Sequence, residues 1–245
     1  MKTLSVIILT YNEEDYIEDA VKSVAFANEI IVIDSESTDR TVDLVSKMDC
    51  KFASRKFDNY CNQRNFALTL TTSDWILFLD ADERVTPKLE KEILEAISKE
   101  EYLAYKIWFP HYFMGRFLFH YTDKVIRLFK NDNSKFKNEV HEKLVIKTKV
   151  GVLKNYMIHY TYKEIYHFLD KKDKYAWFQA KMSHDKKKKA TLFLLFFKPF
   201  YRFFHTYFVK RVFLDGVPGL VSASYDAYGV FSRYAKLYLL EKNLK

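Results

Sequence analysis

Two carboxylates, separated by a single residue, stand directly after an apolar run of the chain. Asp80 and Asp82 follow the segment Trp75–Leu79. Carboxylate oxygens are the ligands that Mg²⁺ and Mn²⁺ prefer, and these ions often bridge a protein to substrate phosphates. A solvated turn before a helix is the alternative, because residues 86–87 (Thr-Pro) form a good helix start. The position directly after a strand-like run favours a metal-binding pair.

A third carboxylate, Asp34, follows a second apolar run, Ile30–Ile33. A carboxylate at that point could accept hydrogen bonds from a ribose or a base. The polar stretch that continues from Asp34 also suits a turn in which Ser37 or Thr38 caps the next helix. The residues alone leave both interpretations open.

Polar and aromatic groups follow the first apolar run, Leu4–Leu9, as Thr10-Tyr11-Asn12-Glu13. Asn12 is predicted to cap a helix that begins after it, but capping does not explain the aromatic ring of Tyr11 in the turn. Farther along, Arg64 lies in Gln63-Arg64-Asn65. A guanidinium can hold a phosphate through two parallel bonds, although a solvated helical arginine is the simpler alternative.

The elements that carry these residues alternate between strand and helix up to about residue 100. The apolar runs are predicted strands, and the segments between them repeat apolar residues at helical spacing. Such alternation predicts a parallel sheet covered by helices on both faces. In open sheets of this kind, ligands bind beyond the carboxyl ends of the strands. Thr10, Asp34, Asp80 and Asp82 all fall at these ends.

The remainder of the chain has a different pattern. Leu103–Phe109 and Lys124–Phe129 are predicted strands, and residues 112–117 between them are predicted to form a loop with exposed aromatic side chains. From about residue 163 the chain is predicted to be helical, with an interruption at Lys186–Lys189. We therefore expect three parts, over residues 1–100, over residues 101–165, and a helical extension over residues 166–245.

Composition limits the class of protein. The chain has 245 residues, of which 49% are hydrophobic, so it can form one substantial core. None of its 5 glycines precedes Gly115, which excludes a glycine-rich phosphate loop and a G-x-G-x-x-G turn in the first 114 residues. Cys50 and Cys61 allow at most one disulfide and no four-cysteine zinc site, so a reducing cytoplasm is expected. The first residues lack the pattern of a signal peptide.

The formal charge of +8 favours an anionic partner: a nucleic acid, a phosphorylated substrate or an acidic lipid surface. No nucleic-acid recognition motif accompanies this charge, so we expect no nucleic-acid partner. A helical face formed by Phe200, Phe203, Phe204, Tyr207 and Phe208 lies among basic residues near the end of the chain. Such a helix is predicted to lie in the headgroup region of a membrane; packing against the sheet or a second subunit is the alternative.

Four motifs together resemble the family 2 glycosyltransferases with the GT-A fold. They are Thr10-Tyr11-Asn12-Glu13, Asp34-Ser35-x-Ser37-Thr38-Asp39-x-Thr41, Gln63-Arg64-Asn65-x-Ala67 and Asp80-x-Asp82. Their order and spacing agree over roughly the first 100 residues. The remainder is similar, more loosely, to the lipopolysaccharide-core β-1,4-glucosyltransferase branch, through Arg127-Leu128-Phe129, Val140-His141-Glu142 and Ile158-His159-Tyr160.

The resemblance implies a mixed, mainly parallel α/β sheet of the GT-A type and a set of site residues. Those implied to bind the nucleotide-sugar donor are Thr10, Tyr11, Glu13, Asp34, Arg64, Asp80 and Asp82. Asp82, Asp80 and His159 are implied to hold a divalent cation (Mg²⁺ or Mn²⁺), with Asp82 as the direct ligand. A structural histidine beside Tyr160 is the alternative role for His159.

The same resemblance implies an inverting reaction in which a carboxylate removes the proton of the acceptor hydroxyl. Glu142 is the predicted base, and the alternative is a surface glutamate paired with Lys143 or His141. A Glu142→Gln variant is then expected to lose transfer and to keep donor binding. Arg127 and His141 are implied to contact the acceptor.

The predicted function is transfer of a hexose from a nucleotide-sugar, most plausibly a UDP-sugar, to a lipid-linked or lipopolysaccharide-core glycan. The enzyme is expected in the cytoplasm, attached peripherally to the inner face of the cell membrane through an anionic surface. The alternatives are transfer in another glycan pathway (capsule or glycoprotein oligosaccharide) with a different donor, and a basic nucleic-acid-binding protein. The sequence leaves open whether the chain forms a homo-oligomer.

Overall fold

The computed structural model describes residues 2–132, 134–137, 143–146, 148–160 and 165–244. The chain divides into two compact units. The first, here called the sheet unit, comprises residues 1–109 and 123–159. The second, here called the helical unit, comprises residues 110–122 and 160–245.

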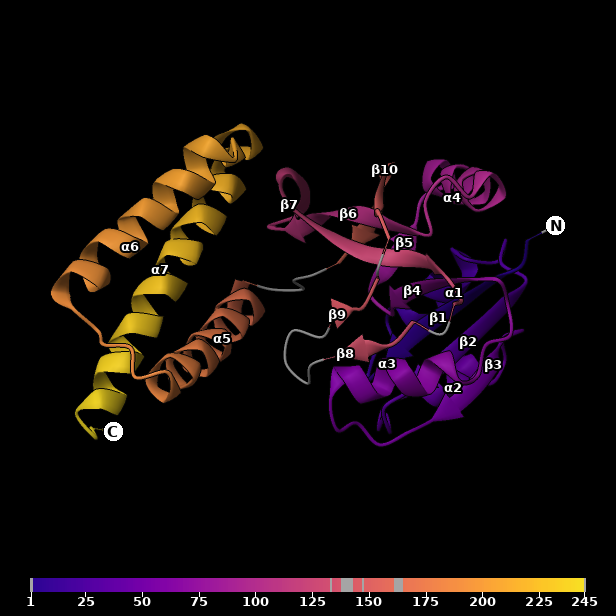
Figure 1. Ribbon diagram of the computed structural model, residues 1–245, viewed down its shortest axis with the longest axis horizontal. Coiled ribbons are helices and arrows are strands. Elements are labelled where there is room, and N and C mark those ends of the chain that lie inside the picture. Colours follow the sequence, from indigo (N-terminus) through magenta and orange to yellow (C-terminus); the bar gives the residue numbers. More distant parts are fainter. Residues whose placement is uncertain (1, 133, 138–142, 147, 161–164, 245) are drawn as a thin grey trace. The chain divides into compact units, whose positions relative to one another are not determined.

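An eight-stranded sheet has the order β3-β2-β1-β4-β7-β6-β10-β5 (Figure 1). Its strands are β1 (Leu4–Thr10), β2 (Glu29–Asp34), β3 (Lys51–Ser54), β4 (Trp75–Asp80), β5 (Glu83–Val85), β6 (Ala104–Phe113), β7 (Arg116–Lys130) and β10 (Gly151–His159). The pairs β3–β2, β2–β1 and β1–β4 are parallel, whereas β4–β7 and β5–β10 are antiparallel. The predicted mixed sheet is therefore confirmed. A two-stranded ribbon, β8 (Phe136–Lys137) with β9 (Lys143–Leu144), lies outside this sheet.

Helices cover both faces of the parallel strands. They are α1 (Ile17–Lys22), α2 (Thr41–Val45), α3 (Tyr60–Leu68) and α4 (Pro87–Lys99). Alternate residues of β1 point to opposite faces: Val6 and Ile8 pack in one core with α1, α2 and α4, and Ile7 and Leu9 pack in the other with α3. The run of buried side chains in β1 thus follows from helices on both sides.

Two local predictions at helix starts differ in outcome. Thr86 caps α4 as predicted, because its hydroxyl accepts the Leu89 amide at 3.2 Å and Pro87 takes the first helical position. Asn12 does not cap α1, which begins only at Ile17. Its backbone instead has a positive φ of 54°, and its side chain accepts the amide of Thr38. Nor does Ser37 or Thr38 cap α2, because the residue before that helix is Arg40.

The predicted loop at residues 112–117 is in fact a tight β-hairpin. The strand β6 continues to Phe113, and β7 starts at Arg116. Met114 and Gly115 form the turn, both with positive φ, which glycine adopts without strain. Phe113 is buried rather than exposed, because its ring packs on Phe168 with centroids 4.9 Å apart.

The helical unit is built from α5 (Ile165–Asp185), α6 (Leu192–Phe204) and α7 (Gly216–Glu241), with a π-helical turn (His205–Val209) and a 3₁₀ turn (Val212–Asp215) between α6 and α7. The predicted interruption at Lys186–Lys189 separates α5 from α6. Asp215 joins the hairpin to the 3₁₀ turn before α7, because its carboxylate accepts three successive amides, those of Phe119, His120 and Tyr121. Gly219 permits close packing here, because a Cβ atom would lie 2.1 Å from the Val212 carbonyl oxygen.

Candidate active site

The carboxyl ends of three neighbouring strands bring the predicted polar residues to one edge of the sheet. Thr10 at the end of β1 is the register partner of Asp34 at the end of β2. On the other side of β1, Leu9 pairs with Asp80 at the end of β4. Because adjacent strands lie about 4.8 Å apart, these three ends fall within about 10 Å of one another. A ligand beyond this edge can contact all of them.

The two loops that follow β1 and β2 are joined to each other by hydrogen bonds. The Asn12 amide donates to the Ser37 hydroxyl at 2.8 Å, and the Thr38 amide donates to the Asn12 side chain at 2.8 Å. The Glu13 amide donates to the hydroxyl of Thr41 at 2.9 Å. These hydrogen bonds hold the segment around Thr10, Tyr11 and Asp34 in place, and this segment is here called the wall.

Within this wall, some polar groups already have partners and others remain open. Asp34 is buried and accepts the Ser37 amide at 2.8 Å and the Ser37 hydroxyl at 2.5 Å. The Thr10 hydroxyl is also buried, and it has no hydrogen-bond partner in the described part of the chain. The side chain of the next residue, Tyr11, is exposed. A buried hydroxyl without a partner is rare in native proteins and often marks a group that an ion, a water or a ligand completes.

Three consecutive residues of α3 join three parts of the site. Gln63 donates to the Ser35 hydroxyl after β2 at 3.2 Å, and Asn65 exchanges two hydrogen bonds with Phe136 of β8. Between them, the guanidinium of Arg64 lies 3.5 Å from Asp80 and over the ring of Phe78, 5.1 Å from its centroid. Arg64 is almost fully buried, so it is not the solvated helical arginine of the simpler interpretation.

Asp80 also belongs to a buried ion network with Glu83 and Arg127. One guanidinium nitrogen of Arg127 donates to Asp80 and to Glu83, at 2.6 Å in each case. The second oxygen of Glu83 accepts the backbone amide of Asp80 at 2.9 Å. Glu83 is only 1% exposed and the Arg127 side chain 8%. This network fixes Asp80 from both its backbone and its side chain.

The charges in the network shift its carboxyl groups in opposite directions. Burial raises the pKa of Glu83 to about 7, the Asp80 charge adds to this, and Arg127 opposes it. Burial also acts to raise the pKa of Asp80, but the guanidiniums of Arg127 and Arg64 outweigh it and hold that pKa well below its usual range. Asp80 is thus ionised at neutral pH, whereas Glu83 titrates near neutral pH.

Asp82 lies in a separate pair with His159 of β10. The strand β5 pairs with β10 so that His159 is opposite Glu83, and the His159 Nε2 atom lies 3.2 Å from an Asp82 oxygen. Burial acts to lower the pKa of His159, but its hydrogen bond to Asp82 and the neighbouring carboxylates outweigh this effect and raise that pKa. The turn that carries Asp82 is held by Arg84, whose guanidinium donates to the carbonyls of Ala81, Glu83 and Tyr16.

The Asp82–His159 pair fits two ligands of one divalent cation. Neighbouring ligands of an octahedral ion about 2.1 Å away lie about 3 Å apart, and the two atoms here are 3.2 Å apart. Asp80 is engaged by two guanidiniums instead. Among the described residues, no group of three or more His, Cys, Asp or Glu side chains is arranged to hold a metal ion. The remaining ligands would therefore come from substrate oxygens or water.

Comparison with known proteins identifies the class to which this site belongs. The family model "Glycosyl transferase family 2" matches residues 5–161, which include every strand of the eight-stranded sheet from β2 to β10 and nearly all of β1. The chain belongs to glycosyl transferase family 2. It is thus a glycosyltransferase with a nucleotide-sugar-binding fold, as the four motifs predict.

Relatives of this glycosyltransferase align over nearly its whole length. An uncharacterized glycosyltransferase of Rickettsia typhi is 31% identical, over 97% of this chain and 87% of the relative. The lipopolysaccharide core biosynthesis glycosyltransferase LpsC of Rhizobium meliloti is 27% identical, over 96% of this chain and 92% of LpsC. The helical unit is therefore shared with these proteins, and it is not peculiar to this chain.

Solved structures confirm the fold. The S. aureus TarS fragment 1–349, in complex with UDP-GlcNAc, superposes with a TM-score of 0.52 at 15% identity. The match covers 99% of the glycosyltransferase described here and 92% of that fragment. This TarS fragment therefore has a similar fold.

The structure brings together most of the residues predicted from sequence. Asp34, Arg64, Asp80 and Thr10 meet at the sheet edge, and His159 lies against Asp82. Arg127 lies against Asp80, and Glu13 lies in the joined loops. The predicted base Glu142 and the predicted acceptor residue His141 fall outside the described residues, and their roles stay predictions.

The sequence interpretation missed Glu83. It directly follows Asp80-Ala81-Asp82, where a third acidic residue looks like one more group in a solvated turn. The sequence does contain a hint of its role. The charged pair Glu83-Arg84 is followed by the apolar residue Val85, which is typical of a short strand with one charged side chain on its buried side. Burial by β10 makes this carboxyl group part of the site.

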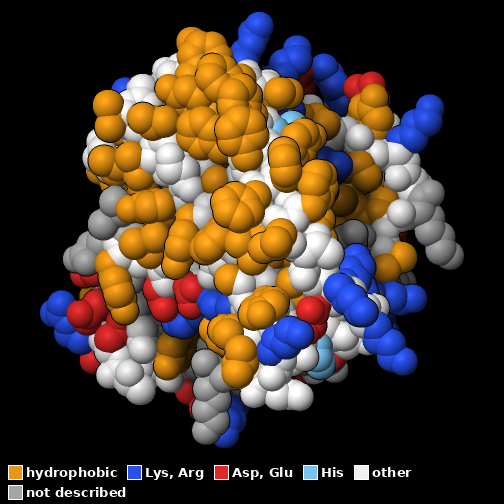
Figure 2. All heavy atoms as spheres, turned by 90° about the vertical axis from the view of Figure 1, so that its left-hand side faces the viewer, with side chains coloured by type: hydrophobic (Ala, Val, Ile, Leu, Met, Phe, Trp, Pro, Cys, Tyr) orange, Lys and Arg blue, Asp and Glu red, His pale blue; other side chains and the backbone are white. Residues whose placement is uncertain are grey.

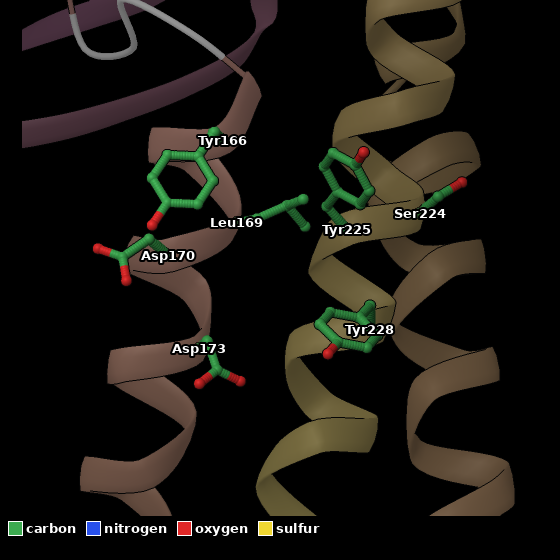
Figure 3. Close-up of a pocket in the computed structure, with 7 residues that line it drawn as sticks. All are labelled: Tyr166, Leu169, Asp170, Asp173, Ser224, Tyr225 and Tyr228. Carbon is green, nitrogen blue, oxygen red and sulfur yellow. The ribbon is translucent and has the colours of Figure 1, made fainter.

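A hollow elsewhere in the protein is distinct from this site. It has a volume of about 560 Å³ and is lined only by residues of α5 and α7, among them Tyr166, Tyr225 and Tyr228 (Figure 3). Its carboxylates already have partners, since Asp170 pairs with Lys174 and Asp173 with Lys236. None of the strand-end residues contributes to it.

The raised pKa of Glu83 predicts how stability depends on pH when EDTA removes divalent ions. The folded protein keeps a proton on Glu83 that the unfolded chain, with an ordinary pKa of 4.5, releases. The corresponding stability is present below pH 4.5 and is lost as the pH rises towards 7. The raised pKa of His159 acts in the same direction above pH 6.5. One pKa unit corresponds to about 1.4 kcal/mol, so Tm should fall by several degrees between pH 5 and pH 8.

A Glu83→Gln variant separates this contribution, because glutamine accepts the Asp80 amide without carrying a charge. We expect its Tm to vary less between pH 5 and pH 7 than that of the wild type, measured by calorimetry. Glu95→Gln is the matched control, since Glu95 is exposed and its pKa is lowered by the Lys99 hydrogen bond. An equally steep profile in Glu83→Gln would contradict the assignment.

Proposed function

We propose that this family 2 glycosyltransferase moves a hexose from a UDP-sugar to a lipid-linked or lipopolysaccharide-core glycan, with inversion at the anomeric carbon and with the help of a divalent cation. One observation carries the proposal: the side chains of Thr10, Asp34, Arg64 and Asp80 meet at one edge of the sheet. Asp82, which follows Asp80 by two positions, forms a pair with His159. Polar groups of these types suit a nucleoside, a diphosphate and a cation together.

The nucleoside would lie against the wall formed after β1 and β2. Asp34 would accept a hydrogen bond from uracil or ribose, and the unsatisfied Thr10 hydroxyl would provide another contact. Tyr11 and Glu13 would line the same wall. UDP as the nucleotide is supported by the similarity in fold to TarS, whose structure contains UDP-GlcNAc.

The diphosphate would lie between the basic and acidic sides of the site. Asp82 and His159 would hold the cation, which when bound supplies positive charge beside the departing diphosphate. Asp80, already fixed by Arg127 and Glu83, would orient the transferred sugar through hydrogen bonds to its hydroxyls. In this arrangement Arg127 acts through Asp80 and is a positioning residue; direct contact of Arg127 with the acceptor stays a sequence-based prediction.

Transfer itself needs a proton to leave the acceptor hydroxyl as its oxygen attacks the anomeric carbon. A carboxylate base typically contributes about 10²–10⁴-fold to such a step, and Glu142 is the residue we propose for it. The acceptor oxygen forms a bond to the anomeric carbon from the side opposite the diphosphate, while the bond between the anomeric carbon and the diphosphate oxygen breaks. One displacement of this kind inverts the configuration and needs no covalent sugar–enzyme intermediate.

The relatives and the helical unit support our proposal for the acceptor and for the place of reaction. LpsC is named for lipopolysaccharide core biosynthesis and aligns over 92% of its length. A lipid-linked acceptor of that class lies at a membrane, so we propose that the enzyme works in the cytoplasm at the inner face of the cell membrane. Residues 1–100 would then bind the donor, 101–165 the acceptor, and 166–245 would attach to the membrane.

The proposal is tested by thermal-shift measurements with UDP-sugars, each with and without Mn²⁺. A ligand that binds only the folded state stabilises that state by mass action and so raises Tm. At a ligand concentration one hundred times Kd, the free energy of unfolding increases by about 2.7 kcal/mol. We expect at least one UDP-hexose to raise Tm by several degrees, and more with Mn²⁺ than with EDTA. Stabilisation by RNA or DNA, with no response to any nucleotide-sugar, would contradict the proposal.

A further inference from the structure

The helix α6 exposes an apolar stripe that nothing in the described structure covers. No residue of α6 is buried, although the helix is one of the most apolar segments of the chain. Leu192 is 78% exposed and Phe196 69%. The stripe, here called the α6 face, consists of exposed side chains that recur every four residues, most of them in adjacent pairs. They are Leu192, Phe193, Phe196, Phe197, Phe200, Tyr201, Phe204 and Phe208.

The rings of the α6 face contact one another in two groups along the helix. Ring centroids are 4.6 Å apart for Phe193 and Phe197, 4.9 Å for Phe200 and Phe204, and 5.0 Å for Phe204 and Phe208. Phe208 then reaches Phe213 in the next turn at 6.4 Å. Figure 2, which looks onto this part of the molecule, shows hydrophobic side chains gathered in a broad patch with Lys and Arg around parts of its edge. A contiguous patch of this kind marks an interaction surface.

The face differs in part from the sequence prediction. Phe200, Phe204 and Phe208 are exposed as expected of a membrane-binding helix, but Phe203 and Tyr207 are partly buried and stack on each other at 5.3 Å. The α-helix ends at Phe204 and a π-helical turn follows. The exposed side chains begin at Leu192, before the first residue of the predicted face.

The segment that carries the face contains basic residues and no acidic ones, although Glu241 of α7 lies near its start, where it accepts the Ala190 amide. No Asp or Glu occurs between residues 186 and 214. The run Lys186–Lys189 before α6, Lys198 within it, and Lys210 and Arg211 after it are all exposed. In the described part of the chain, none of them forms an ion pair with a carboxylate. Their charge is thus available to an anionic partner.

We propose that the α6 face lies in the headgroup region of a bilayer that contains anionic lipids, with its aromatic rings inserted and its lysines on the phosphates. Apolar rings on one side with Lys and Arg beside them are the pattern of an interfacial helix. A second copy of the chain is the less suitable occupant, because lysine is depleted in protein–protein interfaces. Among the described residues no helix is long and apolar enough to cross a membrane, so this contact is one along the surface.

This inference rests on the proposed function in that a lipid-linked acceptor is found at such a surface. It names the contact residues and the lipid charge that the proposed function leaves unspecified. The lysine at position 198 fits the same geometry, since its long aliphatic stem lets the ammonium reach the phosphates while neighbouring rings are inserted.

The test is flotation of the full chain with vesicles in a density gradient, without donor or acceptor. Vesicles of phosphatidylglycerol and phosphatidylcholine in equal parts are compared with vesicles of phosphatidylcholine alone. At low salt we expect at least about tenfold stronger partitioning onto the anionic vesicles, because each lysine near such a surface contributes about fivefold. Phe196→Ser with Phe200→Ser should weaken partitioning at least about tenfold.

Two further variants keep the test decisive. Lys188→Gln with Lys189→Gln should weaken binding to anionic vesicles by about fivefold for each lysine and leave the apolar face intact. Phe52→Ser with Val152→Ser removes two exposed apolar side chains from strands of the sheet unit and should float like the wild type. Circular dichroism melting establishes that each variant is folded.

A wild type that stays at the bottom of the gradient would overturn the inference, as would flotation that the α6 variants leave unchanged. Sedimentation equilibrium gives the remaining outcome: a dimer that Phe196→Ser with Phe200→Ser converts to a monomer, without vesicle binding, would assign the face to a second copy. Because flotation uses no substrate, a protein that floats but binds no nucleotide-sugar would contradict only the proposed function. One that transfers sugar to a water-soluble acceptor but does not float would contradict only this inference.

Discussion

An Asp82→Asn variant should lose at least about 10³-fold in the rate of sugar transfer while it remains folded. Asp82 is the carboxylate paired with His159 at 3.2 Å, in the arrangement that suits a shared cation. Losing stabilisation of the departing diphosphate corresponds to about 4 kcal/mol, in the range measured when one group that stabilises developing charge is removed. The measurement is a single-turnover transfer assay with saturating UDP-sugar and Mn²⁺.

A second readout of the same variant does not depend on activity. The hydrogen bond that His159 donates to Asp82 raises the pKa of His159 against the effect of burial, so Asp82→Asn should lower that pKa in a metal-free NMR titration. Asp74→Asn is the matched control, because Asp74 is an exposed carboxylate next to the opposite end of β4. It should retain near-normal transfer. Equal turnover of Asp82→Asn and Asp74→Asn would remove Asp82 from the site.

An Arg127→Met variant should be destabilised by about 3–5 kcal/mol at pH 8, because removing one partner of a buried ion network leaves the other charges unpaired. Glu83 would lose its guanidinium while 1% exposed, and Asp80 would keep only the longer contact with Arg64. The loss should be smaller at pH 5, where Glu83 is protonated. Urea denaturation at both pH values measures it.

Two controls accompany the Arg127 measurement. Lys130→Met changes another cation of β7, but its ion pair with Glu100 is partly exposed, so the cost should stay within about 1 kcal/mol. Adding Glu83→Gln to Arg127→Met removes the unpaired carboxylate and should restore part of the stability at pH 8. If Arg127→Met costs no more than Lys130→Met, then Arg127 does not hold the network together.

The strand ends of the site could be predicted from sequence because they depend on local patterns. The apolar runs before Thr10, Asp34 and Asp80 define strands, and parallel strands bring their carboxyl ends to one edge. Arg64 could be placed there only through the resemblance to known motifs, since its contact with Asp80 is made across 16 residues by the packing of α3.

The remaining features depend on pairing between distant segments, which a local pattern does not contain. Glu83 is buried because β10, more than 70 residues away, pairs with β5 and brings His159 opposite to it. Asn12 is a good helix cap by type, but its side chain instead joins two loops 26 residues apart. The α6 face begins at Leu192 rather than at Phe200, and Phe203 and Tyr207 stack on each other while partly buried. In each of these cases packing between side chains or segments outweighs the local preference.

A crystal structure of the protein with UDP and Mn²⁺ tests the proposed site most directly. We expect the uracil and ribose against Thr10 and Asp34, and the diphosphate beside an ion that Asp82 and His159 bind. UDP bound in the hollow between α5 and α7, or UDP at the sheet edge with an ion that contacts neither Asp82 nor His159, would contradict it.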